Sequence, residues 1–304
     1  MLATAVASLP RGDGWAYEFK WDGVRALVDV SDQGVTIRSR AGNDVHGAYP
    51  ELVAQADGVG DVLLDGEIVA IRDGRPSFEL LQSRMHVRSA DEARRLASDA
   101  PVTFIVFDIL RRFGVDLQPR PYAERRATLE RWAIEHDGWT ISPTFDDGPA
   151  TEAAAREHGL EGVVAKRVDS RYQPGVRGPD WLKLRFLRSG DFVVIGWEAS
   201  AGRPAELSSL VLACYVDRAL RYAGKVGSGL SGKTARQLQL MLQPAERCAV
   251  DDVPRVAGRI VHWVEPTAVV EVEFATLTDE GRLRHSVFRR IRTDKPAEEA
   301  SGDA

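Results

Sequence analysis

Cysteine is scarce in this chain of 304 residues, and long apolar runs are missing. Cys214 and Cys248 lie far apart and lack the paired spacing of a zinc site. No apolar stretch approaches the ~20 residues that a membrane-spanning helix needs. Residues 1–10 also lack the basic start of a signal peptide. We therefore expect a cytoplasmic protein in a reducing setting, without a structural zinc or a membrane partner.

An excess of positive charge is missing as well, which weakly disfavours a nucleic-acid partner. The net charge is -5, but its distribution matters more than its sum. Residues 163–190 hold seven Lys/Arg and two acids, and residues 282–295 hold six Lys/Arg and one acid. Each tract is either solvated surface charge or a surface for phosphate, and composition does not choose between them.

Two regions of different character follow one another along the chain, with no internal repeat. Residues 1–189 mix strands and helices, which predicts an α+β domain. Strands are expected at residues 15–22, 35–39, 62–71, 102–110 and 162–167. Helices are expected at residues 121–136 and at residues 151–158, the second capped by Thr151 and stopped by Gly159.

The region after Ser189–Gly190 reads mostly as strands. They are expected at residues 191–197, 209–216, 221–226 and 268–275, with one helix from the cap Ser231 to Gln243. Several strands with one inserted helix are typical of a small OB-fold barrel, which we place at residues 190–295. Residues 296–304 are small and acidic, and we expect them to form a flexible tail.

The segment from Tyr17 to Gly23 carries the most chemistry. On a strand, Tyr17, Phe19 and Trp21 share one face, and three aromatic side chains there indicate a buried core. Glu18, Lys20 and Asp22 then share the other face, so Lys20 is held between two acids. Gly23 allows the backbone to turn.

Lysine is a covalent nucleophile when it is deprotonated. Free lysine has a pKa of about 10.4, and nearby cations, including metal ions, favour its neutral form. Taken alone, however, the pattern Lys-x-Asp-Gly favours an exposed strand lysine with incidental ion pairs. The rest of the chain has to decide between these interpretations.

Six further segments follow Lys20 in a fixed order. They are Ser39-Arg40, Leu64-Asp65-Gly66-Glu67, Val106-Phe107-Asp108-Ile109-Leu110, Glu161-Gly162-Val163-Val164-Ala165-Lys166, Trp181-Leu182-Lys183-Leu184-Arg185 and Arg292-Thr293-Asp294-Lys295. Their order and spacing resemble the nucleotidyltransferase motifs of ATP-dependent DNA ligases. The resemblance covers nearly the whole chain and looks strongest to the ligase module of bacterial ligase D, the end-joining enzyme that works with Ku. Residues 39–44 and 224–229 resemble that branch in particular.

The resemblance implies a fold and a reaction. The fold is an adenylation (nucleotidyltransferase) domain of antiparallel sheets with flanking helices, followed by an all-β OB-fold barrel. Lys20 matches the nucleophile that attacks the α-phosphate of ATP and becomes Lys–AMP. The AMP then passes to the 5′-phosphate at a nick, and the 3′-hydroxyl attacks to seal the strand.

The resemblance also implies contacts to ATP. Arg25, Arg40, Arg177 and Lys183 match positions that hold the nucleotide, and their charges suit phosphate. Phe107 matches the aromatic ring that stacks on adenine, although a core phenylalanine is the plain alternative. Glu18 lies on the strand that meets the adenine edge, partly through its backbone, so its side chain need not read the base.

Two carboxylates in the segments that match the ligases suggest a metal site. Glu161 and Glu67 match the motif carboxylates, with Glu161 near Mg²⁺ or Mn²⁺ and Glu67 near the ribose hydroxyls. Mg²⁺ prefers carboxylate and phosphate oxygens and keeps several waters, so few protein ligands are needed. The alternative is that Glu161 only caps the turn after the helix at 151–158. Asp65 shares a face with Glu67 and is expected to support it, and Asp22 matches the pattern without an assigned contact.

One departure and one distant motif complete the comparison with the family. Many ligases carry a second lysine where this chain has Arg185, which leaves the contact of Arg185 to phosphate open. Arg292, Asp294 and Lys295 match the last motif, which faces the pyrophosphate during loading, so the OB domain has to swing between loading and gripping DNA. A DNA-backbone contact is the alternative for this cluster.

Nicked or broken duplex DNA is the implied partner, with Ku by analogy, and the chain is expected to act as a monomer. An RNA ligase or a capping guanylyltransferase shares the lysine–nucleotide intermediate. An inactive OB-fold nucleic-acid-binding protein would need a broken nucleophile or broken carboxylates. A metal-dependent nuclease using Asp65, Glu67 and Asp108 would leave Lys20 unexplained.

Overall fold

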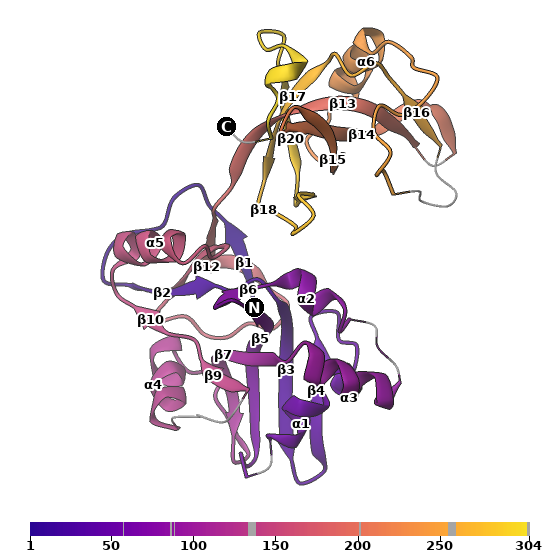
Figure 1. Ribbon diagram of the computed structural model, residues 1–304. Helices are drawn as coiled ribbons and strands as arrows, with labels where there is room; N and C mark the ends of the chain where they lie inside the picture. Colours follow the sequence, from indigo (N-terminus) through magenta and orange to yellow (C-terminus); the bar gives the residue numbers. More distant parts are fainter. Residues whose placement is uncertain are drawn as a thin grey trace. The chain divides into compact units, whose positions relative to one another are not determined.

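Two compact units make up the chain, Met1–Phe186 and Leu187–Ala304 (Figure 1). The computed structural model describes residues 1–56, 58–85, 87, 89–132, 138–200, 202–254 and 260–302. The division lies three residues before Ser189–Gly190, where the sequence placed it, because strand β13 (Arg188–Ser200) already belongs to the second unit. No helix among the described residues is long and apolar enough to span a membrane.

A seven-stranded sheet forms one half of the first unit. Its strands run in the order β4-β3-β5-β7-β8, with β6 beside β5 and β9 beside β7. The bounds are β3 (Val24–Ser31), β4 (Gly34–Ser39), β5 (Val62–Arg72), β6 (Arg75–Pro76), β7 (Val102–Arg112), β8 (Val115–Asp116) and β9 (Trp139–Ile141). All neighbours are antiparallel except β9, which runs parallel to β7.

Helices cover one face of this sheet. They are η1 (His46–Ala48), α1 (Pro50–Ala54), α2 (Phe78–Gln82), α3 (Ala90–Asp99) and α4 (Tyr122–Trp132). Val28 and Leu64 from the sheet pack there with Leu52, Leu81 and Leu129 from the helices. Because side chains alternate along a strand, Arg25 and Glu67 point to the opposite face.

A five-stranded sheet forms the other half of the first unit. Its order is β1-β12-β11-β2-β10. The bounds are β1 (Leu2–Ala5), β2 (Trp15–Lys20), β10 (Thr144–Phe145), β11 (Gly162–Arg167) and β12 (Arg177–Arg185). One face packs against α5 (Gly148–Glu157) through a cluster that contains Tyr17, Val163 and Ala165. The predicted aromatic face of β2 is confirmed, since Phe19 and Trp21 pack against the same cluster.

The second unit is an OB-fold-like β structure. Its main sheet has the order β15-β14-β13-β17-β20, with β16 beside β13, and β18 and β19 form a separate pair. The bounds not given above are β14 (Arg203–Val216), β15 (Ala219–Val226), α6 (Gly232–Met241), β16 (Val261–Trp263), β17 (Val269–Phe274), β18 (Thr276–Leu277), β19 (Leu283–Arg284), β20 (Val287–Ile291) and η2 (Ala297–Glu299). Ser231 caps α6, as predicted, by accepting a hydrogen bond from the Thr234 amide.

Several local predictions differ from the structure. The helix expected at residues 151–158 begins at Gly148, and its cap is Asp147, whose side chain accepts from the Ala150 amide. Pro149 suits the first turn, so the helix starts earlier than Thr151 suggested. β2 ends at Lys20, two residues short of the expected end. Helix α4 ends at Trp132, and residues 133–136 of the predicted helix lie outside the described residues.

The flexible tail expected at residues 296–304 is wrong for the described part. Ala297 and Ala300 are buried in a core cluster with Val193 and Ala213. The Tyr215 amide donates to the Ala300 carbonyl at 2.8 Å, and the Gly302 amide donates to the Asp191 carbonyl at 3.1 Å. Small residues suggested a loose end, but here their size lets the chain pack closely against the sheet.

A charged side chain at Ala300 should therefore destabilise the second unit. Ala300 is fully buried, so Ala300→Asp forces a carboxylate into an apolar cluster and should lower the free energy of unfolding by about 2 kcal/mol or more. Urea unfolding followed by tryptophan fluorescence measures the change. Glu298→Ala, at an exposed position two residues away, is the matched control and should leave the transition in place. An unfolding transition of Ala300→Asp at the same urea concentration as the wild type would contradict the packing of the tail against the sheet.

Candidate active site

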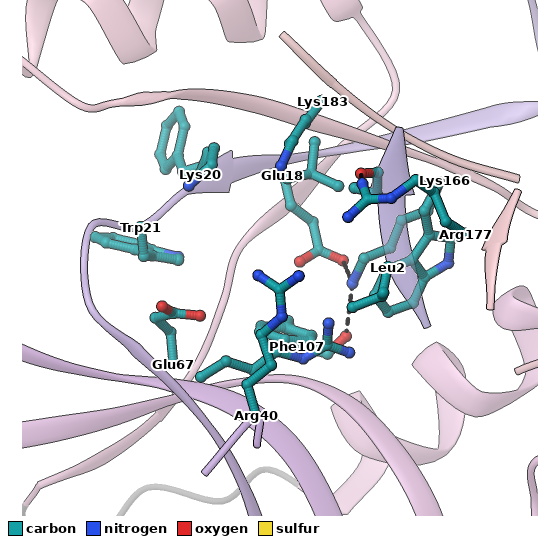
Figure 2. A pocket seen from close by; sticks show the side chains of 15 residues that line it. Leu2, Glu18, Lys20, Trp21, Arg40, Glu67, Phe107, Lys166, Arg177 and Lys183 are labelled. Carbon is teal, nitrogen blue, oxygen red and sulfur yellow. Dashed lines mark hydrogen bonds and ion pairs between the residues drawn. The ribbon is translucent and has the colours of Figure 1, made fainter. Parts of the chain in front are cut away.

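A pocket lies in the first unit between the two sheet faces that the helices leave uncovered. In Figure 2 the labelled side chains of the five-stranded sheet face those of the seven-stranded sheet across it. Among the residues that line it are eight that the sequence singled out: Glu18, Lys20, Arg25, Arg40, Glu67, Phe107, Arg177 and Lys183. Residues from distant parts of the sequence thus converge on one cavity.

Lys20 ends β2 at the mouth of this pocket. Its Nζ forms an ion pair with Glu161, which is 8% exposed and immediately precedes β11. Arg185 Nε lies 3.2 Å from the other oxygen of Glu161. The alternative in which Glu161 only caps the preceding turn does not describe its main contacts, because both of its oxygens face cations.

The pairing of β2 with β11 fixes this arrangement. Lys20 stands opposite Gly162 in the antiparallel register, next to Glu161. A Cβ atom at Gly162 would lie 2.0 Å from the Leu184 carbonyl oxygen, so only glycine allows β11 to approach β12 this closely. The three strands therefore bring Lys20, Glu161 and Arg185 together.

Glu67 faces the pocket from β5. No described residue forms a hydrogen bond or ion pair with it, and burial raises its pKa to about 8. Gly23 lets the turn after β2 lie against β5, since a Cβ atom there would lie 2.3 Å from the Ile68 carbonyl oxygen. Asp22 lies in the same turn, beyond the end of β2. Glu67 is thus a carboxylate whose surroundings lack a compensating partner.

Asp65 does not support Glu67 as the sequence suggested. It is fully buried and accepts hydrogen bonds from Arg25 Nε at 2.9 Å and Arg25 Nη2 at 2.6 Å. The Tyr172 hydroxyl donates to it at 2.7 Å. These contacts use its acceptor capacity and fix the Arg25 guanidinium, which lies 5.6 Å from the centre of the Phe107 ring.

Three more cations surround the pocket. Arg40 follows β4, whereas Arg177 and Lys183 belong to β12. The pKa of Lys183 falls to about 8, first because of burial and then because of nearby Arg185 and Lys20. A cluster of cations that disfavour one another's charge is suited to a polyanion such as a chain of phosphates.

The other end of the pocket is aromatic. Phe107 and Trp181 both line it, with ring centres 6.1 Å apart in an edge-to-face arrangement. Lys166 Nζ lies between them and forms an ion pair with Glu18 at 2.6 Å. Sequence reasoning gave no role to Lys166 or Trp181, although both were part of matching segments. The signal was present, because Lys166 and Val164 share the β11 face opposite the core residues Val163 and Ala165.

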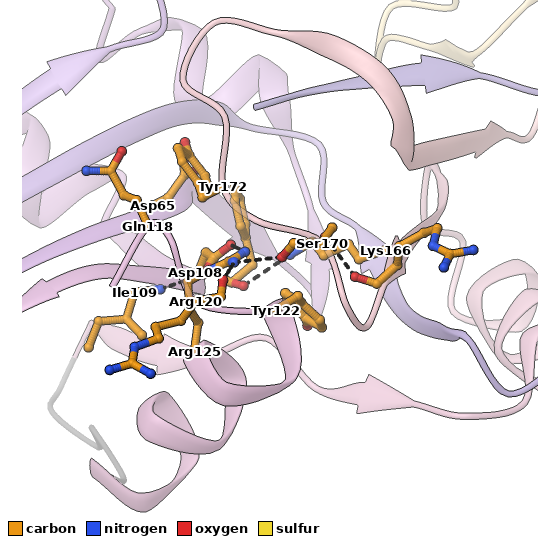
Figure 3. A network of polar contacts seen from close by, with 12 residues as sticks. Asp65, Asp108, Ile109, Gln118, Arg120, Tyr122, Arg125, Lys166, Ser170 and Tyr172 are labelled. Carbon is orange, nitrogen blue, oxygen red and sulfur yellow. Dashed lines mark hydrogen bonds and ion pairs between the residues drawn. The ribbon is translucent and has the colours of Figure 1, made fainter. Parts of the chain in front are cut away.

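A second buried pair lies beneath this end (Figure 3). Asp108 accepts from Arg125 Nε and Nη2, both at 2.8 Å, and both side chains are fully buried. Arg125 also donates to the carbonyls of Arg120 and Ser170. Asp65 and Asp108 are thus both engaged by arginines, and no group of three or more metal-ligating side chains occurs among the described residues. This arrangement gives no support to a nuclease site at these acids.

The last motif forms its own cluster in the second unit. Arg292 Nη1 donates to Asp191 at 2.9 and 3.0 Å, and its other nitrogens donate to Asp294. Lys295 Nζ also donates to Asp191 at 2.9 Å. Arg289 and Arg290 pair with Glu273 and Glu271 in the same way. The positive tract at residues 282–295 is therefore partly compensated by acids that are distant in sequence.

Comparison with known proteins agrees with this geometry. Residues 1–185 match the family model of the ATP dependent DNA ligase domain, and residues 203–295 match that of the ATP dependent DNA ligase C terminal region. The chain belongs to the ATP-dependent DNA ligase family. These two matches account for most of its length, and every segment singled out above lies within the matched residues.

Individual relatives show which ligases this chain is similar to. The chain is 39% identical to the multifunctional non-homologous end joining DNA repair protein LigD of Mycobacterium tuberculosis over 98% of its own length, but it spans only 39% of that relative. It is 32% identical to DNA ligase C2 of Mycolicibacterium smegmatis and covers 91% of it. A solved mycobacterial DNA ligase D complexed with ATP and MES is 36% identical, with a TM-score of 0.55 over 99% of this chain and 98% of that one.

Breaking the buried Asp108–Arg125 pair should destabilise this ligase fold without touching the pocket lining. Asp108→Asn leaves a buried guanidinium without its counter-ion, and the free energy of unfolding should fall by about 3–5 kcal/mol. Thermal or urea unfolding measures the loss. The control is Asp169→Asn, which breaks an ion pair of the same kind between Arg167 and Asp169 at an exposed site. Exposed pairs contribute little, so equal losses in the two variants would contradict the structural role of Asp108.

Proposed function

We propose that this chain is an ATP-dependent DNA ligase that seals nicks through a covalent AMP on Lys20. The observation that carries the proposal is the placement of Lys20 in a pocket that is lined both by cations suited to phosphate and by the edge-to-face aromatic rings of Phe107 and Trp181. That combination fits a purine nucleoside triphosphate with its phosphates beside the lysine. The family match and the ATP complex of a ligase D relative support the same substrate.

The loading step needs a neutral amine in line with the leaving group. A bond forms between Lys20 Nζ and the α-phosphorus, while the bond from that phosphorus to the bridging oxygen breaks and pyrophosphate leaves with the electron pair. The proton lost by Lys20 has a carboxylate beside it, since Glu161 contacts Nζ directly. Arg40, Arg177 and Lys183 hold the charge of the phosphates.

The residues present fit a divalent metal ion. Glu67 has no hydrogen-bond or ion-pair partner among the described residues, and both it and Glu161 offer the hard oxygens that Mg²⁺ and Mn²⁺ prefer. We propose that these two carboxylates hold the metal together with phosphate oxygens and water. The ion would supply electrostatic stabilisation of the charge on the transferring phosphoryl group.

Nicked or broken duplex DNA is the proposed second substrate. We assign the binding of this DNA to the second unit, which matches the C-terminal region of ATP-dependent DNA ligases. The names of the LigD relatives place them in non-homologous end joining and DNA repair, and we extend that role to this chain, with Ku as a partner. A monomer in the cytoplasm is part of the proposal, and the thiols of Cys214 and Cys248 suit a reducing compartment.

Labelled AMP should be retained on Lys20. The protein is mixed with α-labelled ATP and Mg²⁺ or Mn²⁺ without DNA, denatured and counted. The wild type should carry the label, whereas Lys20→Ala should carry none because it lacks the nucleophile. Lys233→Ala, at an exposed position in the second unit, is the control and should label normally.

Sealing and base choice are tested on the same preparation. A labelled protein should join a nicked duplex when unlabelled ATP is absent, and GTP should not replace ATP in loading. Equal labelling of Lys20→Ala and the wild type would disprove the nucleophile. Efficient loading from GTP would favour a capping-type enzyme, and joining of RNA nicks alone would favour an RNA ligase.

Affinity for ATP should weaken in alkaline buffer. The pKa of Lys183 is about 8, so its ammonium is charged below that pH and becomes neutral above it. If bound phosphate keeps Lys183 protonated, the Kd for ATP should rise roughly tenfold between pH 7 and pH 9. Lys183→Met should bind ATP more weakly at pH 7 and show a smaller rise with pH. The Kd for ATP is measured at equilibrium in proteins that also carry Lys20→Ala, which prevents turnover. Equal pH profiles with and without Lys183→Met would contradict the role of Lys183.

A further inference from the structure

Tyr172 is a buried residue that does not line the pocket but reaches a side chain that does. It lies between β11 and β12, and 7% of its surface is exposed. It is not among the described residues that line the cavity, and it belongs to none of the segments that resemble the ligases. A buried tyrosine usually finds a hydrogen-bond partner for its hydroxyl, so the partners of this hydroxyl indicate what it does.

The hydroxyl of Tyr172 joins Asp65 and Arg25. It donates to Asp65 Oδ2 at 2.7 Å (Figure 3) and accepts from Arg25 Nη2 at 3.3 Å. Burial, and then the Asp65 carboxylate, raise the pKa of Tyr172 above its ordinary value. The hydroxyl therefore remains a hydrogen-bond donor at neutral and mildly alkaline pH.

The backbone and the ring of Tyr172 hold this hydroxyl in place. Its amide donates to the Gln118 carbonyl at 2.9 Å, and two residues earlier the Ser170 carbonyl accepts from the buried Arg125 at 3.0 Å. The ring packs edge-to-face on Trp181, with ring centres 5.9 Å apart. Tyr172 thus belongs to the packed part of the first unit, and its hydroxyl is a fixed point for the groups that it contacts.

Asp65 depends on this fixed point. Among the described residues it accepts hydrogen bonds only from Arg25 and from Tyr172. The bonds to Arg25 align the carboxylate with the guanidinium, but they do not connect the pair to the rest of the protein. That connection comes from the Tyr172 hydroxyl and from the Met1 carbonyl, which accepts from Arg25 Nη1.

The same contacts leave one donor of Arg25 unused. A guanidinium carries one N–H group on Nε and two on each Nη atom. Nε donates to Asp65, Nη2 donates to both Asp65 and Tyr172, and Nη1 donates to the Met1 carbonyl. Among the described residues, the second N–H of Nη1 has no such acceptor, and Arg25 lines the pocket. A bound nucleotide can therefore accept from it.

We infer that Tyr172 is a positioning residue for ATP binding, because through Asp65 it fixes the Arg25 guanidinium and orients its unused N–H before the nucleotide enters. This inference rests on the proposed use of ATP. Fixing an arginine side chain costs rotamer freedom, and a side chain that is already ordered in the free protein leaves less ordering to be done on binding. Tyr172 itself does not touch the nucleotide and acts only through Arg25.

Removing the hydroxyl should weaken ATP binding without slowing the loading chemistry. Tyr172→Phe keeps the ring against Trp181 but releases Asp65, so the Kd for ATP should rise on the order of fivefold, as expected for one hydrogen bond. The Kd is measured at equilibrium in proteins that also carry Lys20→Ala. At saturating ATP and with Lys20 present, the rate of label transfer should stay within about twofold of the wild type, because the reacting groups are untouched.

A double-mutant cycle separates this role from a merely structural one. Arg25→Lys keeps a cation beside Asp65 but lacks the planar fork of the guanidinium, and it should raise the Kd for ATP by itself. Adding Tyr172→Phe to Arg25→Lys should raise the Kd little further, because the group that Tyr172 positions is already gone. Tyr49→Phe is the matched control and should leave the Kd unchanged, since Tyr49 is 2% exposed and packs under the helices of the same unit.

A measurement on the wild type tests the same inference if Tyr172→Phe does not fold. Proton–nitrogen NMR follows the exchange of the Arg25 Nε proton with water, and the signal is assigned by its loss in Arg25→Lys. This proton should exchange slowly both without and with ATP, because the guanidinium is ordered in the free protein. Slow exchange that appears only after ATP is added would overturn the preorientation.

The remaining outcomes separate the role of Tyr172 from the proposed function. A folded Tyr172→Phe protein with the wild-type Kd for ATP, or effects of Tyr172→Phe and Arg25→Lys that add in full, would overturn the role of Tyr172. A wild type that neither binds ATP nor transfers its label to Lys20 would instead overturn the proposed function. Near-ultraviolet circular dichroism establishes that each variant is folded.

Discussion

The close antiparallel approach of β2, β11 and β12 is the constraint on which the site depends. Lys20 lies opposite Gly162, and Gly162 in turn leaves room for the backbone of β12. Without this approach Lys20 and Arg185 would not both reach the side chain of Glu161. The aromatic face of β2 anchors the strand from behind, so Lys20 is held by packing on one side and by charge on the other.

Buried ion pairs hold the other charged side chains in and beneath the pocket in place. Asp65 fixes Arg25, Asp108 fixes Arg125, and Glu18 fixes Lys166. Each pair loses solvation, which its internal contacts have to offset, and such pairs favour a single geometry more than they add stability. Glu67 has no such partner among the described residues, and burial raises its pKa to about 8.

Much of this fold was predictable because its strands alternate clearly. The aromatic face of β2, the buried β5 and β7 and the Ser231 cap were confirmed. Strand β3 was missed although its burial alternates, and strand β12 was missed because Gly178 and Pro179 near its start are not typical of a strand. The packed tail was predicted wrongly, because composition says that residues are small but not which cavity they fill.

The sequence by itself determined the family and singled out Lys20 and most of the residues around it, because seven segments in a fixed order carry enough information to match the ligases. Tertiary structure alone decided which charges face each other. It turned Asp65 toward Arg25 rather than Glu67, buried Lys166 against Glu18, and paired the arginines of the last motif with Asp191 and its neighbours. Strand pairing brings together residues more than a hundred positions apart, and local sequence holds no record of those distances.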